Sequence, residues 1–280
     1  MEHPHTLSHH SLRWSGQTDR GRIRKNNEDS FLCLQFDARE VQYLGKIGEA
    51  SLGKHDFAFA VSDGMGGAKA GEFASRITVE KITKLLPPAY KLGALGLEAG
   101  IDDVLVELFD QIHKALMHLG RSYEECQGMG ATLTLGWFTP GWLFFAHIGD
   151  SRLYYAPSRE QGKSLEAGGL RQLSHDDTYV GWLQRQGQIN EREARSHPAK
   201  NALQKALGAG HQFVEPQIGA VAFEPGDRFL LCTDGVVDGY FDSTLLDELR
   251  TPGMTAQRLV QGAVMSSGRD NATALIIDVV

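Results

Sequence analysis

Acidic residues stand at the turn ends of five separate apolar segments in this 280-residue chain. Carboxylates brought within a few ångströms of one another repel, and each raises the pKa of the others, unless a multivalent cation neutralises them. Hard oxygen ligands favour Mg²⁺ or Mn²⁺. The pattern therefore predicts a divalent metal cluster formed by the motifs Asn27-Glu28-Asp29, Ser62-Asp63-Gly64, Gly149-Asp150-Ser151, Thr233-Asp234-Gly235 and Arg269-Asp270-Asn271.

The positions of these acids relative to the apolar runs indicate how a fold would gather them. Asp63, Asp150 and Asp234 follow or end strongly apolar runs, and Asp270 stands just before the last one. Strand ends from distant parts of a chain can meet at one rim, where a rigid and partly dry environment sharpens metal binding. A single Asp in a turn is more often only a turn residue, so the prediction depends on the five motifs acting together.

Strand signals outnumber helix signals along the chain. Apolar runs predict strands at 30–36, 57–63, 131–138, 142–149, 151–156, near 170, and at 214–223, 227–235 and 272–280. Helical spacing predicts helices over 70–86, ended by Pro87-Pro88, over 101–119, and a pair between 243 and 268. Segment 37–56 is predicted to be a long hairpin connection. Because strands follow one another, we expect an α+β fold with two mainly antiparallel sheets packed face to face.

Composition excludes several classes of function. The net charge of −7 and the pI near 5.9 argue against a nucleic-acid binder, which usually carries a concentrated basic surface. No apolar run approaches the ~20 residues of a membrane-spanning helix, and the N-terminus lacks the apolar region of a signal peptide. We therefore expect a soluble, cytoplasmic protein. Cys33, Cys126 and Cys232 are odd in number and far apart, which favours buried free thiols over disulfides or zinc ligands.

The first ten residues contain four histidines and have no helical or strand periodicity. We predict that residues 1–13 form a flexible tail and that 14–280 form a single catalytic domain. A metal site built from the tail residues His3, His5, His9 and His10 is the alternative, which an unstructured tail disfavours.

Several other side chains are better explained by a structural role than by metal binding or catalysis. His147, in an apolar run, is interpreted as a packed core histidine. His175-Asp176-Asp177 is interpreted as the N-cap of a helix starting near Tyr179 rather than as a metal site, and His197-Pro198 as a helix stop. Trp137, Trp142 and Trp182 are interpreted as packing residues, because no basic residues interleave with them as in a base-stacking surface.

Six longer motifs follow one another along the chain beyond residue 14. They are TDRGRIRKNNEDS from Thr18, SDGMGG from Ser62, GMGATLTL from Gly128, HIGDSRLYY from His147, LLCTDGVVD from Leu230 and GRDNATALII from Gly268. In type and order they resemble the motifs of the PP2C-type, metal-dependent serine/threonine protein phosphatases. Segment 174–208 resembles the flap of the bacterial branch of that family.

The resemblance implies a fold and a set of metal ligands. The fold is a four-layer αββα sandwich, with two mainly antiparallel sheets flanked by helix pairs. Asp63 would bridge two metal ions, Mn²⁺ or Mg²⁺, and Gly64 would offer its backbone carbonyl to the first. Asp234 and Asp270 would bind the second ion. Asp150, with Asp234, would hold a weaker third ion.

The resemblance also implies a reaction. Glu28 and Asp29 would orient metal-bound waters, and Arg24 would hold the substrate phosphate as a charge-assisted fork. A water shared by two cations loses a proton near neutral pH and can attack phosphorus directly. The expected activity is hydrolysis of phosphoserine and phosphothreonine on proteins, opposed by a bacterial serine/threonine kinase. We expect a monomer that binds neither nucleic acid nor membrane.

Two other functions remain as alternatives. The run Phe57–Gly71 places a Gly-rich turn between a strand and a helix, as nucleotide-binding loops do, but Lys69 is followed by Ala70 where such a loop has Ser or Thr. A non-catalytic phosphoprotein-binding scaffold is the second alternative. The presence of Asp63, Asp234 and Asp270 disfavours it.

Overall fold

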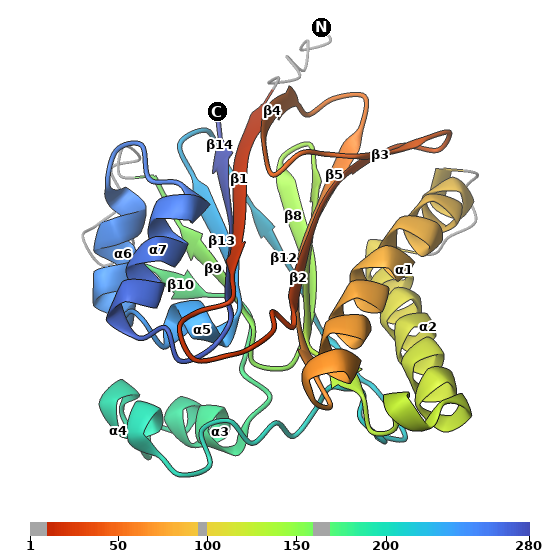
Figure 1. Cartoon of the computed structure of the whole chain (residues 1–280). Helices are drawn as coiled ribbons and strands as arrows, with labels where there is room; N and C mark the ends of the chain where they lie inside the picture. Colours follow the sequence, from red (N-terminus) through yellow and green to blue (C-terminus); the bar gives the residue numbers. More distant parts are fainter. Residues whose placement is uncertain (1–9, 95–99, 159–168) are drawn as a thin grey trace, which may run out of the picture.

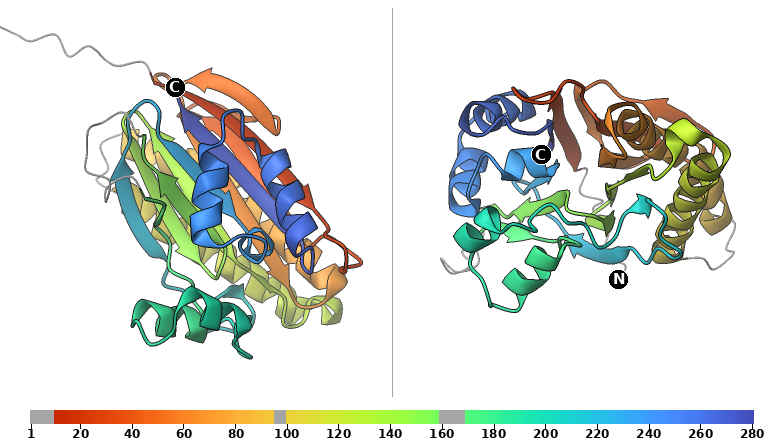
Figure 2. Two further views of the ribbon diagram at one scale, coloured as in Figure 1. Left: turned by 90° about the vertical axis from the view of Figure 1, so that its left-hand side faces the viewer. Right: turned by 60° about the horizontal axis from the view of Figure 1, so that its bottom comes forward.

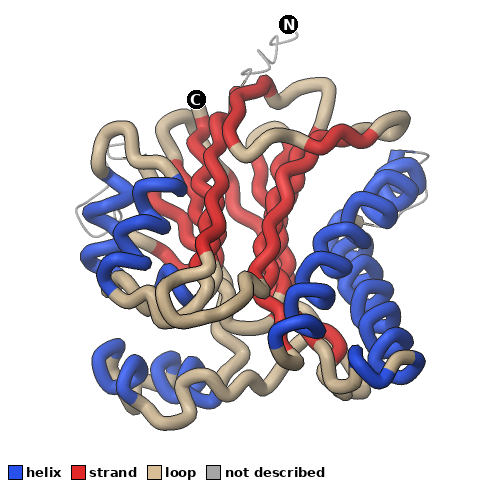
Figure 3. The backbone as a smooth tube through the Cα atoms, in the orientation of Figure 1, coloured by secondary structure: helices blue, strands red, loops and turns tan. Residues whose placement is uncertain are grey.

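The computed structural model describes residues 10–94, 100–158 and 169–280. Within these ranges two antiparallel sheets lie face to face, and helices cover both outer faces (Figures 1 and 3). This is the expected αββα arrangement. The strands are β1 (Ser11–Asp19), β2 (Asp29–Phe36), β3 (Val41–Tyr43), β4 (Ile47–Ser51), β5 (Asp56–Met65), β6 (Gly130–Ala131), β7 (Leu133–Thr139), β8 (Trp142–Ile148), β9 (Arg152–Ala156), β10 (Arg171–Gln172), β11 (Leu207–Gly208), β12 (Gln217–Ala222), β13 (Arg228–Cys232) and β14 (Ala272–Val279).

The helices fall into three groups. The pair α1 (Ala68–Ala94) and α2 (Ile101–Ser122) covers the sheet ordered β11-β6-β5-β7-β8-β12, to which β2 and β3 are attached through β5. The group α5 (Asp234–Val237), α6 (Asp242–Arg250) and α7 (Ala256–Ser266) covers the sheet ordered β10-β9-β13-β14-β1-β4 (Figure 2). The short helices α3 (Tyr179–Arg185) and α4 (Glu191–Ser196) lie apart, beneath one end of the sandwich in Figure 1. A single 3₁₀ turn, Glu124–Cys126, follows α2.

Burial on both faces explains why the central strands are continuously apolar. In β5, Phe57, Phe59 and Val61 point between the two sheets, whereas Ala58 and Ala60 point toward α1 and α2. Successive side chains of a strand alternate between its faces, so a strand covered on both sides needs apolar residues at every position. The small alanines on the helix-facing side let α1 approach the sheet closely.

The N-terminal strand was not expected from the sequence. β1 begins at Ser11, so residues 11–13 belong to the sheet and not to the predicted tail; residues 1–9, with His3, His5 and His9, lie outside the described residues. β1 has few large apolar side chains, of which Leu12 and Trp14 are buried. Its position depends on pairing with β14 and β4, which no local pattern reveals.

Two boundary predictions are corrected. Segment 37–56 is more than a connection, because it contains β3 and β4, and β4 crosses to pair with β1 in the other sheet. Helix α1 does not end at Pro87-Pro88 but continues to Ala94. Proline disfavours a helix interior through its missing N–H, yet its fixed φ is itself helical, so the chain can continue.

Predictions about single residues are mostly confirmed. All three cysteines are buried and free. Trp137 is buried, and Trp182 stacks on Tyr179 in α3. Trp142, at the start of β8 next to the β7–β8 turn, is 48% exposed and packs on the ring of Phe144. No helix in the described ranges is both long enough and apolar enough to cross a bilayer.

Candidate metal centre

Acidic residues from distant segments meet at one end of the sandwich. In the pairing of β2 with β5, Asp29 lies directly opposite Asp63. The side chain of Asp63 also interacts electrostatically with Asp150, Asp234 and Asp270. This is the end of the sandwich next to α5 and the short helices α3 and α4 in Figure 1. The fold therefore brings together the acids that the sequence pattern singles out.

Burial and mutual repulsion raise the pKa values of four of these carboxyl groups, Asp29, Asp63, Asp150 and Asp234. Burial, then repulsion from Asp29, Asp234 and Asp150, raises the pKa of Asp63 well above its usual value. The same two causes raise the pKa of Asp234. Burial raises the pKa of Asp29 to about 7, and burial together with Asp176 raises that of Asp150 to about 7. Such a cluster holds its full negative charge at neutral pH only when cations offset it.

Two carboxylate oxygens of the cluster lack any hydrogen-bond partner. They are the buried Oδ1 atoms of Asp29 and Asp234. The other oxygen of Asp29 accepts hydrogen bonds from the hydroxyls of Thr233 (2.8 Å) and Thr273 (2.7 Å), which fixes the direction of the free one. Buried polar atoms are rarely left unpaired, because desolvation without a partner is costly. Free, hard oxygens in an acidic cluster fit a divalent cation such as Mg²⁺ or Mn²⁺.

The ligand atoms of these acids are not gathered tightly around one point. In the described part of the chain, no three of these carboxylates bring ligand atoms within 4.8 Å of one another. Two ions about 3.5–4 Å apart, each about 2.1 Å from its ligands, need ligand atoms spread over roughly 8 Å. The group that does meet the tighter limit, Asp37, Glu40 and His55, lies at the opposite end of the sandwich.

The main chain at Gly64 is packed too closely for a side chain. A Cβ at this position would lie 1.9 Å from the carbonyl oxygen of Gly71. The amide of Gly64 donates to the carbonyl of Glu28 (3.2 Å), and the amide of Asp63 donates to the hydroxyl of Thr132 (2.9 Å). These two hydrogen bonds thus hold Asp63 and the backbone of Gly64 in place.

Arg24 reaches the cluster from the loop between β1 and β2. Its guanidinium donates from Nη2 to Oδ2 of Asp270 at 2.6 Å, and its side chain is 48% exposed. Glu28 lies on the same loop, and burial followed by repulsion from Asp270 raises its pKa, against the opposing effect of Arg24. A planar cation is thus placed at the solvent side of the acids, where it can contact an anionic ligand.

Comparison with known proteins identifies the family. Residues 48–261 match the sequence model of Protein phosphatase 2C. The chain belongs to the protein phosphatase 2C family. It is 35% identical over 274 residues to the serine/threonine protein phosphatase PstP of Mycobacterium tuberculosis (strain ATCC 25618 / H37Rv), a match that covers 96% of this chain and 45% of PstP. The chain therefore spans about half the length of that relative.

A second relative matches over most of its length, and the solved catalytic domain of PstP matches over nearly all of its own. The serine/threonine phosphatase stp of Listeria monocytogenes serotype 4b (strain F2365) is 32% identical over 267 residues, covering 94% of both chains. The catalytic domain of PstP, solved in complex with two manganese ions, superposes with a TM-score of 0.71 at 32% identity, covering 97% of this chain and 99% of that one. The fold and a two-metal centre thus occur together in a relative.

Asn271 is a residue of this phosphatase 2C site that the sequence analysis did not single out. Its side-chain amide accepts from the backbone N–H of Glu28 (2.8 Å) and donates to the carbonyls of Arg20 and Asn26 (both 2.9 Å). It therefore clamps the loop that carries Arg24 and Glu28 against the start of β14. Its position next to Asp270 in the GRDN motif is the only signal in the sequence.

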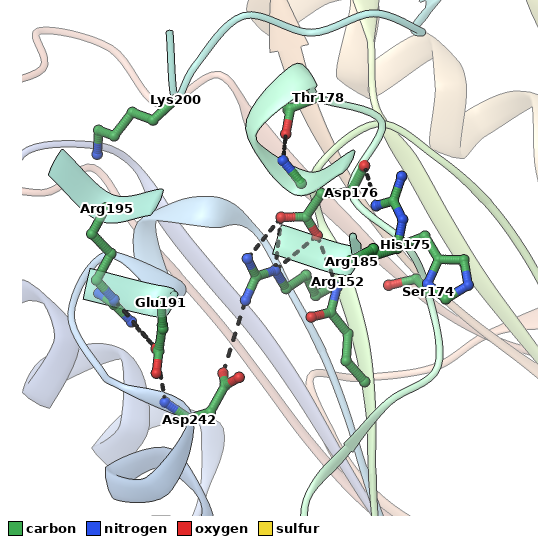
Figure 4. A network of polar contacts seen from close by, with 12 residues as sticks. Arg152, Ser174, His175, Asp176, Thr178, Arg185, Glu191, Arg195, Lys200 and Asp242 are labelled. Atoms are coloured by element: carbon green, nitrogen blue, oxygen red, sulfur yellow. Dashed lines mark hydrogen bonds and ion pairs between the residues drawn. The ribbon is translucent and has the colours of Figure 1, made fainter. Parts of the chain in front are cut away.

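The segment that precedes α3 in this phosphatase 2C chain is tied to the turn that carries Asp150. Asp177 accepts from the amide of Gly149 (3.0 Å) and donates its own amide to the Gly149 carbonyl (2.7 Å). Its neighbour Asp176 pairs with Arg152 at 2.7 Å (Figure 4). The prediction that one of these acids caps α3 is wrong. The N-cap is Thr178, whose hydroxyl accepts a hydrogen bond from the amide of Gly181. The predicted stop is confirmed, since α4 ends at Ser196, just before His197-Pro198.

His147 has the predicted role of a packed core histidine. It is fully buried, and its Nδ1 lies 2.8 Å from the hydroxyl of Thr134. Its Nε2 lies 3.0 Å from the carbonyl of Gly149, next to Asp150. Burial lowers the pKa of the imidazole, so it stays neutral beside the acids. His147 therefore supports the Asp150 turn from inside the core.

Gly149 provides a test of how precisely this turn must be built. Its φ is +111°, and a Cβ would lie 2.5 Å from Cγ2 of Thr132. We expect Gly149→Ala to lower the free energy of unfolding by about 1–3 kcal/mol, measured by urea denaturation, through strain and overpacking together. Gly141→Ala is the matched control: its φ is +80° but its Cβ would meet nothing within 4 Å, so it carries the strain alone. Equal losses would contradict a close contact at Gly149.

Proposed function

We propose that this chain hydrolyses phosphoserine and phosphothreonine on proteins, with two divalent cations, Mn²⁺ or Mg²⁺, at the acidic end of the sandwich. The observation that carries the proposal is the pair of buried, unpartnered oxygens on Asp29 and Asp234, two carboxyls whose pKa values are raised by burial. Membership of the phosphatase 2C family supports the same reaction.

In this proposal the acids divide the work of binding the metals. Asp63 would bridge two ions, with the backbone carbonyl of Gly64 as a further ligand of the first. Asp234 and Asp270 would bind the second, and Asp150, with Asp234, a weaker third ion. The hydrogen bonds that fix Asp63 to Thr132 and the Asp150 turn to the flap support these roles, because bound metals need ligands held in place.

The remaining polar residues would handle substrate and water. When bound, the cations supply Lewis acidity and a water of lowered pKa. Arg24 would bind the non-bridging oxygens of the phosphate and offset the charge that develops on them. Asp29 is held by Thr233 and Thr273, and with Glu28 would accept hydrogen bonds from water and so orient it. No side-chain nucleophile is needed, so the reaction forms no covalent phosphoenzyme.

Further parts of the proposal concern the cellular setting. We infer a cytoplasmic signalling role, with phosphorylated proteins as substrates and a bacterial serine/threonine kinase as the opposing enzyme. Residues 14–280, joined by the β1 residues 11–13, would act as one catalytic domain with the flap at about 174–208. The chain would work as a monomer, without nucleic-acid or membrane partners.

The direct test is hydrolysis of a phosphothreonine peptide and of a small aryl phosphate. Release of phosphate should require Mn²⁺ or Mg²⁺, and should disappear with EDTA and in an Asp63→Asn variant that keeps the fold. Asp247→Asn, on the exposed side of α6, is a matched control with unchanged activity. Activity that survives EDTA or Asp63→Asn would refute the proposal.

Arg24 gives a second prediction about the same reaction. We expect Arg24→Ala to lower kcat/KM about 10- to 100-fold, because a hydrogen bond to a charged group contributes about 1.5–3 kcal/mol. Arg24→Lys should restore part of this loss, since it keeps the charge but not the planar fork. The control is Arg13→Ala, which breaks an exposed ion pair with Glu49 at the other end of β1. A wild-type kcat/KM in Arg24→Ala would exclude phosphate binding by this residue.

A further inference from the structure

Four cations crowd the loop between β1 and β2. Arg20, Arg22, Arg24 and Lys25 fall within six consecutive residues that contain no acid, in a chain whose net charge is −7. All four are exposed. The proposed reaction uses Arg24 alone, so it leaves the other three unexplained.

This loop runs along the border of the metal centre. The amide of Arg22 donates to the carbonyl of Gly268 (2.8 Å), and its guanidinium donates to the carbonyl of Ser267 (2.6 Å). The loop after α7 therefore lies beside it, and it adds the exposed Arg269 directly before Asp270. We call Arg20, Arg22, Lys25 and Arg269 the basic rim.

The charges of the basic rim are not neutralised by nearby acids. Within the described residues, Arg24 forms an ion pair with Asp270, whereas no carboxylate lies within 4.0 Å of a charged nitrogen of the basic rim. Arg20 and Arg22 donate to the backbone carbonyls of Lys25 and Ser267, which leaves their full positive charge in place. Ile23, in the middle of the loop, is 72% exposed and offers an apolar contact between these cations.

We propose that the basic rim binds negative charge that flanks the scissile phosphoester in the substrate polypeptide. The preferred substrates are then phosphoserine or phosphothreonine segments with Asp, Glu or a second phosphate close by. The inference rests on the proposed function and adds the substrate class. Charge complementarity carries it, because unpaired exposed cations at the mouth of a site raise the local concentration of anionic ligands and are screened by salt.

The test compares three phosphothreonine peptides that differ only in their flanks: neutral residues, glutamates, or one additional phosphoserine. Exposed charge pairs contribute a factor of about 1.5 to 5 each, so kcat/KM for the two anionic peptides should exceed that for the neutral one by about tenfold at low salt. The difference should shrink in 0.5 M NaCl. In the variant Arg20→Gln/Arg22→Gln/Lys25→Gln, the ratio of kcat/KM for the anionic peptides to that for the neutral peptide should fall below about twofold. The rate on a small aryl phosphate should be unchanged.

Two control variants separate local charge from other effects. Arg39→Gln/Lys46→Gln/Lys54→Gln removes the same charge from exposed positions at the opposite end of the sandwich and should keep the preference. Arg20→Lys/Arg22→Lys keeps the charge and should keep the preference too. The glutamate and phosphoserine peptides distinguish side-chain carboxylates from a second phosphate as the better ligand; both are negative charge and both support the proposal.

Binding gives a readout that does not depend on turnover. The same peptides with a non-hydrolysable phosphonate in place of the phosphate are titrated by fluorescence anisotropy against the wild type and the rim variant. If the anionic peptides bind more tightly than the neutral one to the wild type but not to the rim variant, the basic rim is supported. This holds even if no peptide is hydrolysed, a result that would refute the proposed function without refuting the basic rim. Equal kcat/KM values and equal Kd values for the neutral and anionic peptides would overturn the inference, whatever the activity.

Discussion

Replacement of Asp234 by asparagine is expected to remove phosphatase activity and, at the same time, to stabilise the metal-free protein. Asp234 has a buried oxygen without a partner and a pKa raised by burial and by Asp150 and Asp270. Asparagine has nearly the same shape as aspartate, but it carries no negative charge to balance that of a bound cation. Metals supply several kcal/mol of transition-state stabilisation, so we expect kcat to fall at least about a thousandfold.

The opposite effect on stability follows from the same repulsion. Without metal, the Asp234 carboxyl is either a buried charge among like charges or holds a proton that it would release in the unfolded chain; Asp234→Asn removes this cost and should raise the free energy of unfolding by about 1–2 kcal/mol. For a domain of this size, that is a rise in melting temperature of roughly 2–8 °C. Asp247→Asn, fully on the solvent side of α6, should change neither property. A variant that loses both activity and metal-free stability would show that Asp234 is structural.

Removal of metal is expected to make stability fall as pH rises. Asp29 and Asp150 have pKa values of about 7 in the folded, metal-free protein, against 3.8 as their ordinary value. Between pH 3.8 and about 7, the unfolded chain has released the protons of both carboxyls while the folded protein still holds them. Protonation therefore favours the fold below pH 3.8, and this contribution is lost as pH rises through about 7.

The measurement is urea denaturation in EDTA from pH 4.5 to 8. We expect the free energy of unfolding to fall by several kcal/mol over this range, since each of the two carboxyls contributes about 1.4 kcal/mol per pH unit until it ionises near pH 7. Added Mn²⁺ at 100 times its Kd should restore about 2.7 kcal/mol at pH 8 and much less at pH 5, where protons compete with the ion. The double variant Asp29→Asn/Asp150→Asn should lose the part of the pH dependence that these two carboxyls supply and keep the part from Asp63 and Asp234, whose pKa values are also raised. A metal-free stability that rises with pH would show that these carboxyls ionise easily and do not form a repelling cluster.

The elements of this fold were largely predictable because their signals are local. The apolar run of β5 and the helical spacing of α2 result from burial that each segment undergoes by itself. The acidic residues at the turn ends could also be recognised from the local sequence. β1 escaped prediction because only Leu12 and Trp14 mark its buried face, and its place is set by β14 at the far end of the chain.

The residue types at the site, the strands that carry them and, through six ordered motifs, the family can all be inferred from the amino-acid sequence. Which residues meet depends on the folded molecule: examples are the pairing of Asp29 with Asp63, the hydrogen bond from Asn271 to the loop of Glu28, and the row of unpaired cations beside Asp270. The physical reason is distance along the chain. Register between strands, burial of a carboxylate and the absence of a counter-charge depend on segments that meet only when the sheets pack, so no local pattern encodes them.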